Sequence, residues 1–98
     1  METMIMCKIK EIISKLENAD NNTKNELENV LVNYGTEALP VLVDQLQAIR
    51  GVQRGVVAMT LIRIGGPSVE YLENAAKVNK DFKWVAQYLI REIQGIAA

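Results

Sequence analysis

Residue types that carry covalent chemistry are scarce in this sequence. Histidine is absent, and the only cysteine is Cys7. A Ser-His-Asp or Cys-His arrangement for nucleophilic catalysis is therefore excluded, as are metal sites built on imidazole or on paired thiolates. Lys8 and Lys10 lie close to Cys7 in the sequence, but two lysines alone are a weak case for a reactive thiol. We predict no catalytic residue, no cofactor and no metal, and hence a protein that is not an enzyme.

Two short segments have the composition of ligand-binding loops. The segment "ADNNTKNELE" at residues 19–28 is rich in oxygen ligands, but it lacks the glycine and the bidentate glutamate position that an EF-hand requires. The segment "IGGPS" at residues 64–68 has two glycines without the Lys-Ser/Thr pair and preceding strand of a phosphate-binding loop. We interpret the first as a helix-capping loop and the second as a junction between two helices.

Residues suited to binding gather in the second half of the chain. Trp84, Tyr88 and Arg91 combine large aromatic area with a charged donor, a combination favoured at binding hot spots. At 100° per residue they lie opposite the apolar side of their predicted helix. The predicted protein-binding residues lie on two predicted helices. The helix at 82–95 contributes Trp84, Gln87, Tyr88 and Arg91, and the helix at 52–64 contributes Met59 and Arg63. In an alternative reading, Trp84 and Tyr88 cover the C-terminal end of the fold or pack on the preceding helices.

Charge is divided unevenly along the chain. Residues 17–44 hold six acids and one lysine, giving −5, whereas residues 45–69 hold three arginines and no acid, giving +3, within a net charge of −1. We expect Arg54 to pair with an acid such as Asp44, which leaves Arg63 and Arg91 available for an acidic partner.

Helix signals run from end to end, and no β-branched stretch alternates apolar and polar residues with period two. The sequence predicts an all-α fold. Short connections make each helix antiparallel to the one before it. The six predicted helices cover about residues 2–18, 23–34, 37–49, 52–64, 67–78 and 82–95.

Local signals set the expected helix ends. A capping box of Thr23 and Glu26 would begin the second helix, with Leu27, Val30, Leu31 and Tyr34 on its apolar side, and Gly35 would end it. The third helix would carry Leu39, Leu42, Val43 and Leu46 inward. The remaining expected end signals are Thr36 as the cap of the third helix, Asp81 as the cap of the sixth and Gly95 as its end.

The chain contains an internal repetition. Residues 57–63, "VAMTLIR", and residues 85–91, "VAQYLIR", match at five of seven positions. The segment "YGTEALPVL" likewise aligns with "IGGPSVEYL". A period of about 30 residues with two helices per unit is typical of an α-solenoid. We predict one domain, residues 1–98, made of three helical hairpins at about 1–35, 36–65 and 66–98.

The repeated segments "LVNYGTEALPVLVDQL", "RGVVAMTLIRIGG" and "VAQYLIREIQG" resemble the short HEAT-like repeats of phycobilisome (PBS) lyase-type proteins. The resemblance implies an α-α superhelix and a small adaptor or scaffold that binds another protein on the concave face of its second helices. HEAT-like folds also include nucleic-acid-binding modules, and some family members attach or detach bilins. The alternatives are therefore a nucleic-acid-binding module and a non-catalytic subunit of a bilin or tetrapyrrole lyase.

The expected partner is an acidic-apolar peptide segment or helix of another protein. Few groove cations beside an acidic half argue against nucleic acid. The N-terminal stretch is interrupted by Lys8, Lys10 and Glu11, so it has neither a membrane span nor the apolar core of a signal peptide. With its single cysteine, the chain is expected to be cytoplasmic and not to bind membranes. The less polar C-terminal end, with Ile96, would permit a homodimer.

Overall fold

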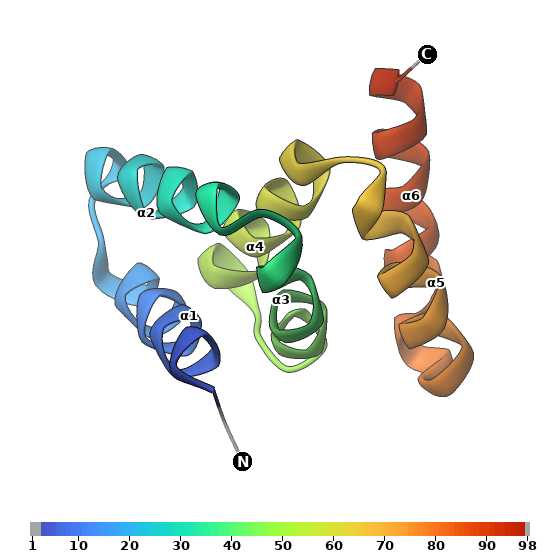
Figure 1. Ribbon diagram of the computed structural model, residues 1–98, viewed down its shortest axis with the longest axis horizontal. Helices are drawn as coiled ribbons and strands as arrows, with labels where there is room; N and C mark the ends of the chain where they lie inside the picture. Colours follow the sequence, from blue (N-terminus) through green and yellow to red (C-terminus); the bar gives the residue numbers. More distant parts are fainter. Residues whose placement is uncertain (1–2, 98) are drawn as a thin grey trace.

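A computed structural model of the protein describes residues 3–97, with the side chains of residues 3–95. This part of the chain forms six α-helices joined by short turns and contains no strand (Figure 1). The expected all-α fold is confirmed. The helices are α1 (Met4–Lys15), α2 (Asn21–Tyr34), α3 (Leu39–Leu46), α4 (Gly51–Ile64), α5 (Pro67–Val78) and α6 (Lys83–Ala97), with 3₁₀ turns η1 (Leu16–Asn18), η2 (Gly35–Ala38) and η3 (Lys80–Phe82).

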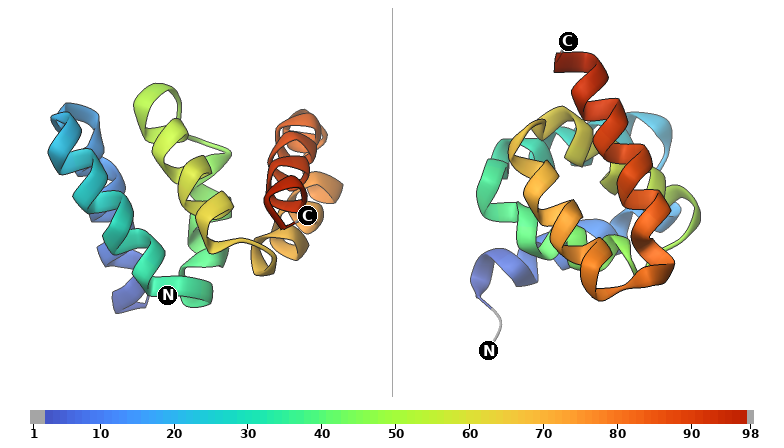
Figure 2. Two further views of the ribbon diagram at one scale, coloured as in Figure 1. Left: turned by 90° about the horizontal axis from the view of Figure 1, so that it is seen from above. Right: turned by 90° about the vertical axis from the view of Figure 1, so that its right-hand side faces the viewer.

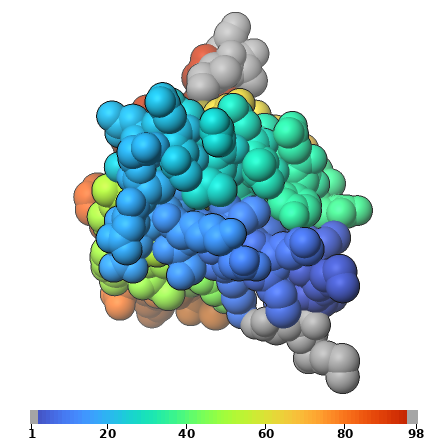
Figure 3. Space-filling view, turned by 90° about the vertical axis from the view of Figure 1, so that its left-hand side faces the viewer, coloured from blue at the N-terminus to red at the C-terminus, as the bar shows by residue number. Residues whose placement is uncertain are grey.

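The helices lie in three adjacent pairs, α1 with α2, α3 with α4, and α5 with α6 (Figure 2, left). The first helices of the pairs contact one another in chain order, α1 on α3 and α3 on α5, and the second helices do the same, α2 on α4 and α4 on α6. The described part measures 33 × 30 × 23 Å. Helices α1 and α2 cover one end of the molecule (Figure 3), and α5 and α6 cover the other (Figure 2, right). The middle pair is thus covered on both sides.

Helix α3 is the most deeply buried helix. Five of its eight residues are buried: Leu39, Val41, Leu42, Val43 and Leu46. A helix that is apolar on nearly all sides belongs in a core, and α3 packs between α1 and α5. The predicted inward positions of this helix are confirmed. The same apolar cluster also contains Ile9, Ile13, Leu31, Val57, Leu61, Leu72, Ala86, Leu89 and Ile93, so one core extends through all three pairs.

The start of α2 differs from the predicted capping box. Asp20 is the cap, because its Oδ1 accepts a hydrogen bond from the backbone N–H of Thr23 at 2.8 Å. The helix therefore begins at Asn21, and the roles predicted for Thr23 and Glu26 are wrong. A carboxylate is the stronger acceptor for an unpaired amide at a helix N-terminus, where the helix dipole also favours negative charge. The backbone hydrogen bond from Thr23, with a weaker contribution from its side chain, lowers the pKa of Asp20.

The junction between α2 and α3 agrees with prediction only in part. Gly35 ends α2 with φ of 65°, a positive value that favours glycine, so this prediction is confirmed. Thr36 does not cap α3, because the chain first makes the η2 turn and α3 begins at Leu39. Pro40 lies in the first turn of α3, where its missing N–H removes no helical hydrogen bond.

The ends of α6 were also predicted incorrectly. Asn79, rather than Asp81, acts as the cap of the preceding turn, since its Oδ1 accepts from the backbone N–H of Asp81 at 3.1 Å. Gly95 does not end α6, which continues to Ala97. A glycine inside a helix costs only about 1 kcal/mol relative to alanine. Ile96, named above for a homodimer contact, lies outside the residues whose side chains are described.

One buried hydroxyl group of α5 bonds to α4, and a second buried hydroxyl group bonds within α4. Ser68 Oγ donates to the carbonyl oxygen of Leu61 at 2.9 Å, and Thr60 Oγ1 donates to that of Val56 at 2.8 Å. Both side chains are fully buried, so their hydrogen bonds avoid the cost of an unpaired polar group. None of the described helices combines the length and the apolar character needed to cross a bilayer.

Candidate protein-binding site

The predicted binding residues of α6 form one exposed stripe. Trp84, Gln87, Tyr88 and Arg91 follow the helical spacing i, i+3, i+4, i+7 and are all exposed. Trp84 is 74% exposed and Tyr88 56%. These fractions count against the alternative in which the two aromatic side chains pack on the preceding helices. Large aromatic side chains at such exposure offer much apolar area to a partner.

Met59 and Arg63 lie one turn apart on α4, the helix next to α6. Met59 is 48% exposed, and the side chain of Arg63 is 41% exposed. Val52 and Gly55 continue this exposed side toward the start of α4. The six predicted residues therefore lie on the exposed sides of two helices in contact.

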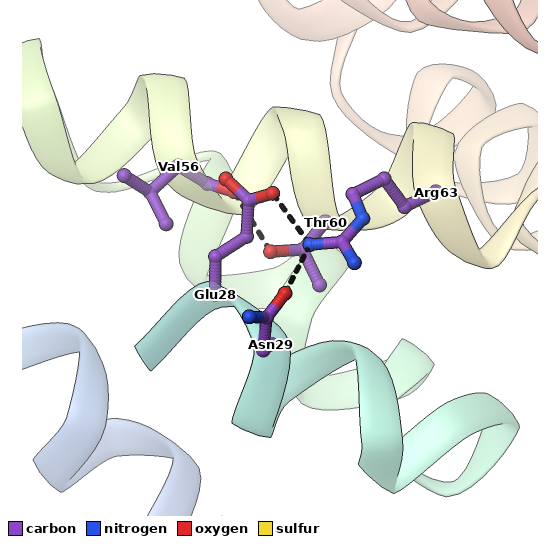
Figure 4. Close-up of polar contacts among 5 residues, drawn as sticks. All are labelled: Glu28, Asn29, Val56, Thr60 and Arg63. Carbon is purple, nitrogen blue, oxygen red and sulfur yellow. Dashed lines mark hydrogen bonds and ion pairs between the residues drawn. The ribbon is translucent and has the colours of Figure 1, made fainter. Parts of the chain in front are cut away.

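Arg63 is engaged within the molecule (Figure 4). Its Nη1 donates to Glu28 Oε2 at 2.7 Å and to Asn29 Oδ1 at 2.9 Å, both on α2. The Glu28 side chain is only 18% exposed, so this ion pair is partly shielded from solvent. The prediction that Arg63 stays available is wrong, because the flank of α2 that bears Glu28 faces α4.

The two other arginines considered above, Arg54 and Arg91, form no ion pair among the described residues. No ion pair joins Arg54 to Asp44 within residues 3–95, so the predicted pairing is not observed. Arg91 makes no ion pair with the described side chains. It is therefore a cation on the α6 stripe without an ion-pair partner among residues 3–95.

Helix α2 continues the exposed surface with amide and acidic side chains. Glu26, Asn29 and Asn33 are exposed. Val30, predicted to face inward, is 42% exposed and lines a shallow depression of about 210 Å³ with Asn33 and Tyr34. Helix α2 is an edge helix that contacts α1 and α4, and only Leu31 is fully buried in it, so its apolar stripe is narrower than the sequence suggested.

The exposed side chains of α4 and α6 offer contact area to a partner. No three His, Cys, Asp or Glu side chains in this part of the chain lie close enough to hold a metal ion. Cys7 is exposed on α1. The features with a defined chemical character are the aromatic stripe of α6, the Arg91 guanidinium and the basic groove described next.

Sequence reasoning missed a groove between α5 and α6. It has a volume of about 400 Å³ and is lined by Ala76, Lys77, Lys80, Lys83, Ala86, Gln87 and Ile90. The available signal was the spacing of the three lysines, three residues apart across the α5–α6 turn. That spacing places the three lysines near one turn. The apolar side chains that line the groove with these lysines come together only when α5 packs on α6.

The chain matches no protein-family model, no curated protein and no solved structure.

Proposed function

We propose that the protein is a small helical scaffold that binds another protein on the exposed sides of α4 and α6. The observation that carries this proposal is the pair Trp84 and Tyr88, 74% and 56% exposed and one turn apart on α6. Burial of two aromatic side chains against a partner gains large area at a low cost in side-chain entropy, and Arg91 adds a charged donor beside them.

We further infer that the three helix pairs are repeats of a short α-solenoid of the HEAT-like type. Two observations support this architecture: the parallel rows of contacts α1–α3–α5 and α2–α4–α6, and the similar segments 57–63 and 85–91, which lie in the second helices of adjacent pairs. The proposed repeats are about 1–35, 36–65 and 66–98. In a solenoid of this kind the second helices line the concave, partner-binding side.

The side chains on this surface favour an acidic-apolar segment of a partner protein. Met59 is a flexible apolar contact that adapts to different partners, and Arg91 supplies a positive charge that no described carboxylate offsets. Arg63 adds mainly its aliphatic stem, because Glu28 balances its charge. Glu26 and Asn33 on α2 would form a polar rim.

The proposal is tested by affinity capture from the native cell lysate with wild type and with the triple variant Trp84→Ala/Tyr88→Ala/Arg91→Glu. Arg63 is left intact because its replacement would also remove the contact with α2. The variant Lys8→Glu on α1, which changes the net charge by the same amount as Arg91→Glu, is the matched surface control, and circular dichroism must show equal helix content in all three proteins.

We expect one partner to be captured by wild type and by the α1 control and to be lost from the triple variant. The dissociation constant for that partner should rise at least about tenfold, since a single hot-spot residue contributes 2 kcal/mol or more. Equal capture by all three proteins would remove the α4–α6 surface from consideration.

A further inference from the structure

We propose that the groove between α5 and α6 is a second docking surface, which binds an acidic amphipathic helix of a partner protein. Every residue lining the groove belongs to α5, to the η3 turn or to α6. It therefore lies at the outer end of the molecule, where Figure 2 (right) shows α5 and α6 with no other helix in front of them. The exposed stripe of Trp84, Tyr88 and Arg91 lies on a neighbouring side of α6, and only Gln87 belongs to both surfaces.

The lining of the groove combines an apolar floor with a basic rim. Ala86 is buried, and Ala76 and Ile90 are half-buried against the core. Lys77, Lys80 and Lys83 are exposed, and the lining contains no carboxylate. A helix has both features needed to fill this groove, an apolar stripe for the floor and a polar side for the rim.

Charge indicates an acidic partner. Lys77, Lys80 and Lys83 lie around the turn between α5 and α6, and none of them forms an ion pair with a described carboxylate. Three like charges around one groove repel one another, and carboxylates of a docked helix would replace that repulsion with attraction. The lysine stems can meanwhile lie along the apolar side of the docked helix.

The internal packing of the protein indicates that the occupant is helical. The corresponding face of the middle pair is covered by helices, α5 on α3 and α6 on α4. The groove between α5 and α6 is the equivalent position one pair further along, and no helix of this chain among the described residues occupies it. A partner helix there would continue the packing that α5 makes on α3.

A second copy of this chain fits the groove less well than an acidic partner. A twofold contact through this end would place two sets of three lysines against each other. The opposite end of the molecule exposes Lys8 and Lys15 on α1, and its Glu11 is already paired with Lys15 at 3.4 Å. Helix α2 at the same end exposes Glu26, while Glu28 is engaged by Arg63. That end therefore mixes acids with lysines and lacks the uniformly acidic polar side of the proposed partner helix.

The test uses two labelled helical peptides of about 18 residues, long enough for five turns. Both carry leucines on one side, and the other side carries glutamates in the acidic peptide and lysines in the basic one. Fluorescence anisotropy titrations compare wild type, the groove variant Lys77→Glu/Lys80→Glu/Lys83→Glu, and the control Lys8→Glu/Lys15→Glu/Lys24→Glu, which has the same net charge. The substituted lysines belong to the exposed or half-buried surface, and circular dichroism verifies folding.

We expect wild type to bind the acidic peptide at least about tenfold more tightly than the basic one at low salt, with the difference shrinking as salt is added. The groove variant should lose at least about tenfold in affinity for the acidic peptide, and the control less than about threefold. Amide resonances of residues 76–90 should shift during titration. The variant Trp84→Ala/Tyr88→Ala should bind the acidic peptide as wild type does, which separates this surface from the α4–α6 surface.

Three results would overturn the proposal. The first is equal affinity of wild type for both peptides, and the second is an equal loss in the groove and control variants. The third is a different occupant of the groove. A second copy of the chain would appear in sedimentation experiments as a dimer that only the groove variant dissociates. A fatty acid would appear as binding of dodecanoate at residues 76–90 without binding of the acidic peptide.

Discussion

Among single residues, Arg63 makes the best-defined contact between helix pairs. Its Nη1 meets Glu28 at 2.7 Å and Asn29 at 2.9 Å, and Glu28 is only 18% exposed. The contact joins α4 to α2 across a long separation in sequence. An ordinary surface ion pair contributes about 0–1 kcal/mol to stability. Because Arg63 has two acceptors and Glu28 is mostly shielded from solvent, we expect this contact to lie at the upper end of that range.

We predict a coupling free energy of about 1 kcal/mol between Arg63 and Glu28 in a double-mutant cycle of Arg63→Ala and Glu28→Ala, measured by urea unfolding. The pair Lys15 and Glu11 serves as the comparison, since its side chains are 63% and 65% exposed at 3.4 Å. Its coupling should be about 0.3–0.5 kcal/mol. A coupling for Arg63 and Glu28 no larger than that value would show that the contact stabilises the fold no more than an ordinary exposed ion pair does.

At the scale of helices and their ends, glycine has two opposite roles in this chain. Gly65 ends α4 with φ of 87°, whereas Gly55 lies inside α4. An added Cβ would meet no atom within 4 Å at either position. The two sites thus differ in backbone conformation and not in available space.

We predict that Gly65→Ala lowers the free energy of unfolding by about 1–3 kcal/mol, because alanine is strained at this positive φ. Gly55→Ala should raise it by about 0.5–1 kcal/mol, because alanine has the higher helix propensity. Thermal unfolding followed by circular dichroism should show Tm shifts in opposite directions, about 4–8 °C per kcal/mol. A loss of stability in both variants would contradict the assignment of Gly55 to a regular helix interior.

At the scale of the whole molecule, the three helix pairs share one core through α3. Leu42 is fully buried at the centre of this helix, which contacts both α1 and α5. Loosening α3 should therefore weaken the packing of both outer pairs. A chain of this size typically has only about 5–15 kcal/mol of stability to lose.

We predict that Leu42→Ala lowers the free energy of unfolding by about 2–5 kcal/mol and increases hydrogen exchange in the helices of all three pairs. Val52→Ala on the exposed side of α4, at a residue 47% exposed, should change stability by about 0.5 kcal/mol or less. Exchange that increases in α3 and α4 alone, with α5 and α6 still protected, would mean that the pairs unfold independently.

Much of the fold could be predicted because helix formation depends on neighbours within one or two turns. The position of Gly35 and the apolar spacing of Leu39, Leu42 and Leu46 indicated a helix end and a buried helix. Cap residues were less predictable, since Asp20 and Thr23 could each supply a side-chain oxygen at the start of α2. In the structure the cap is the Asp20 carboxylate, which lies before the first turn and accepts a hydrogen bond from the Thr23 amide.

By itself, the sequence determined the helical class, the absence of histidine chemistry and the exposed stripe of Trp84, Tyr88 and Arg91, because each depends on composition or on spacing along one helix. Only the tertiary structure decided that Arg63 binds Glu28 and that Val30 is exposed. It also brought the lysines of the α5–α6 turn to the rim of an apolar groove. These properties depend on which flank of one helix faces another, and the periodicity of a single helix does not encode that choice.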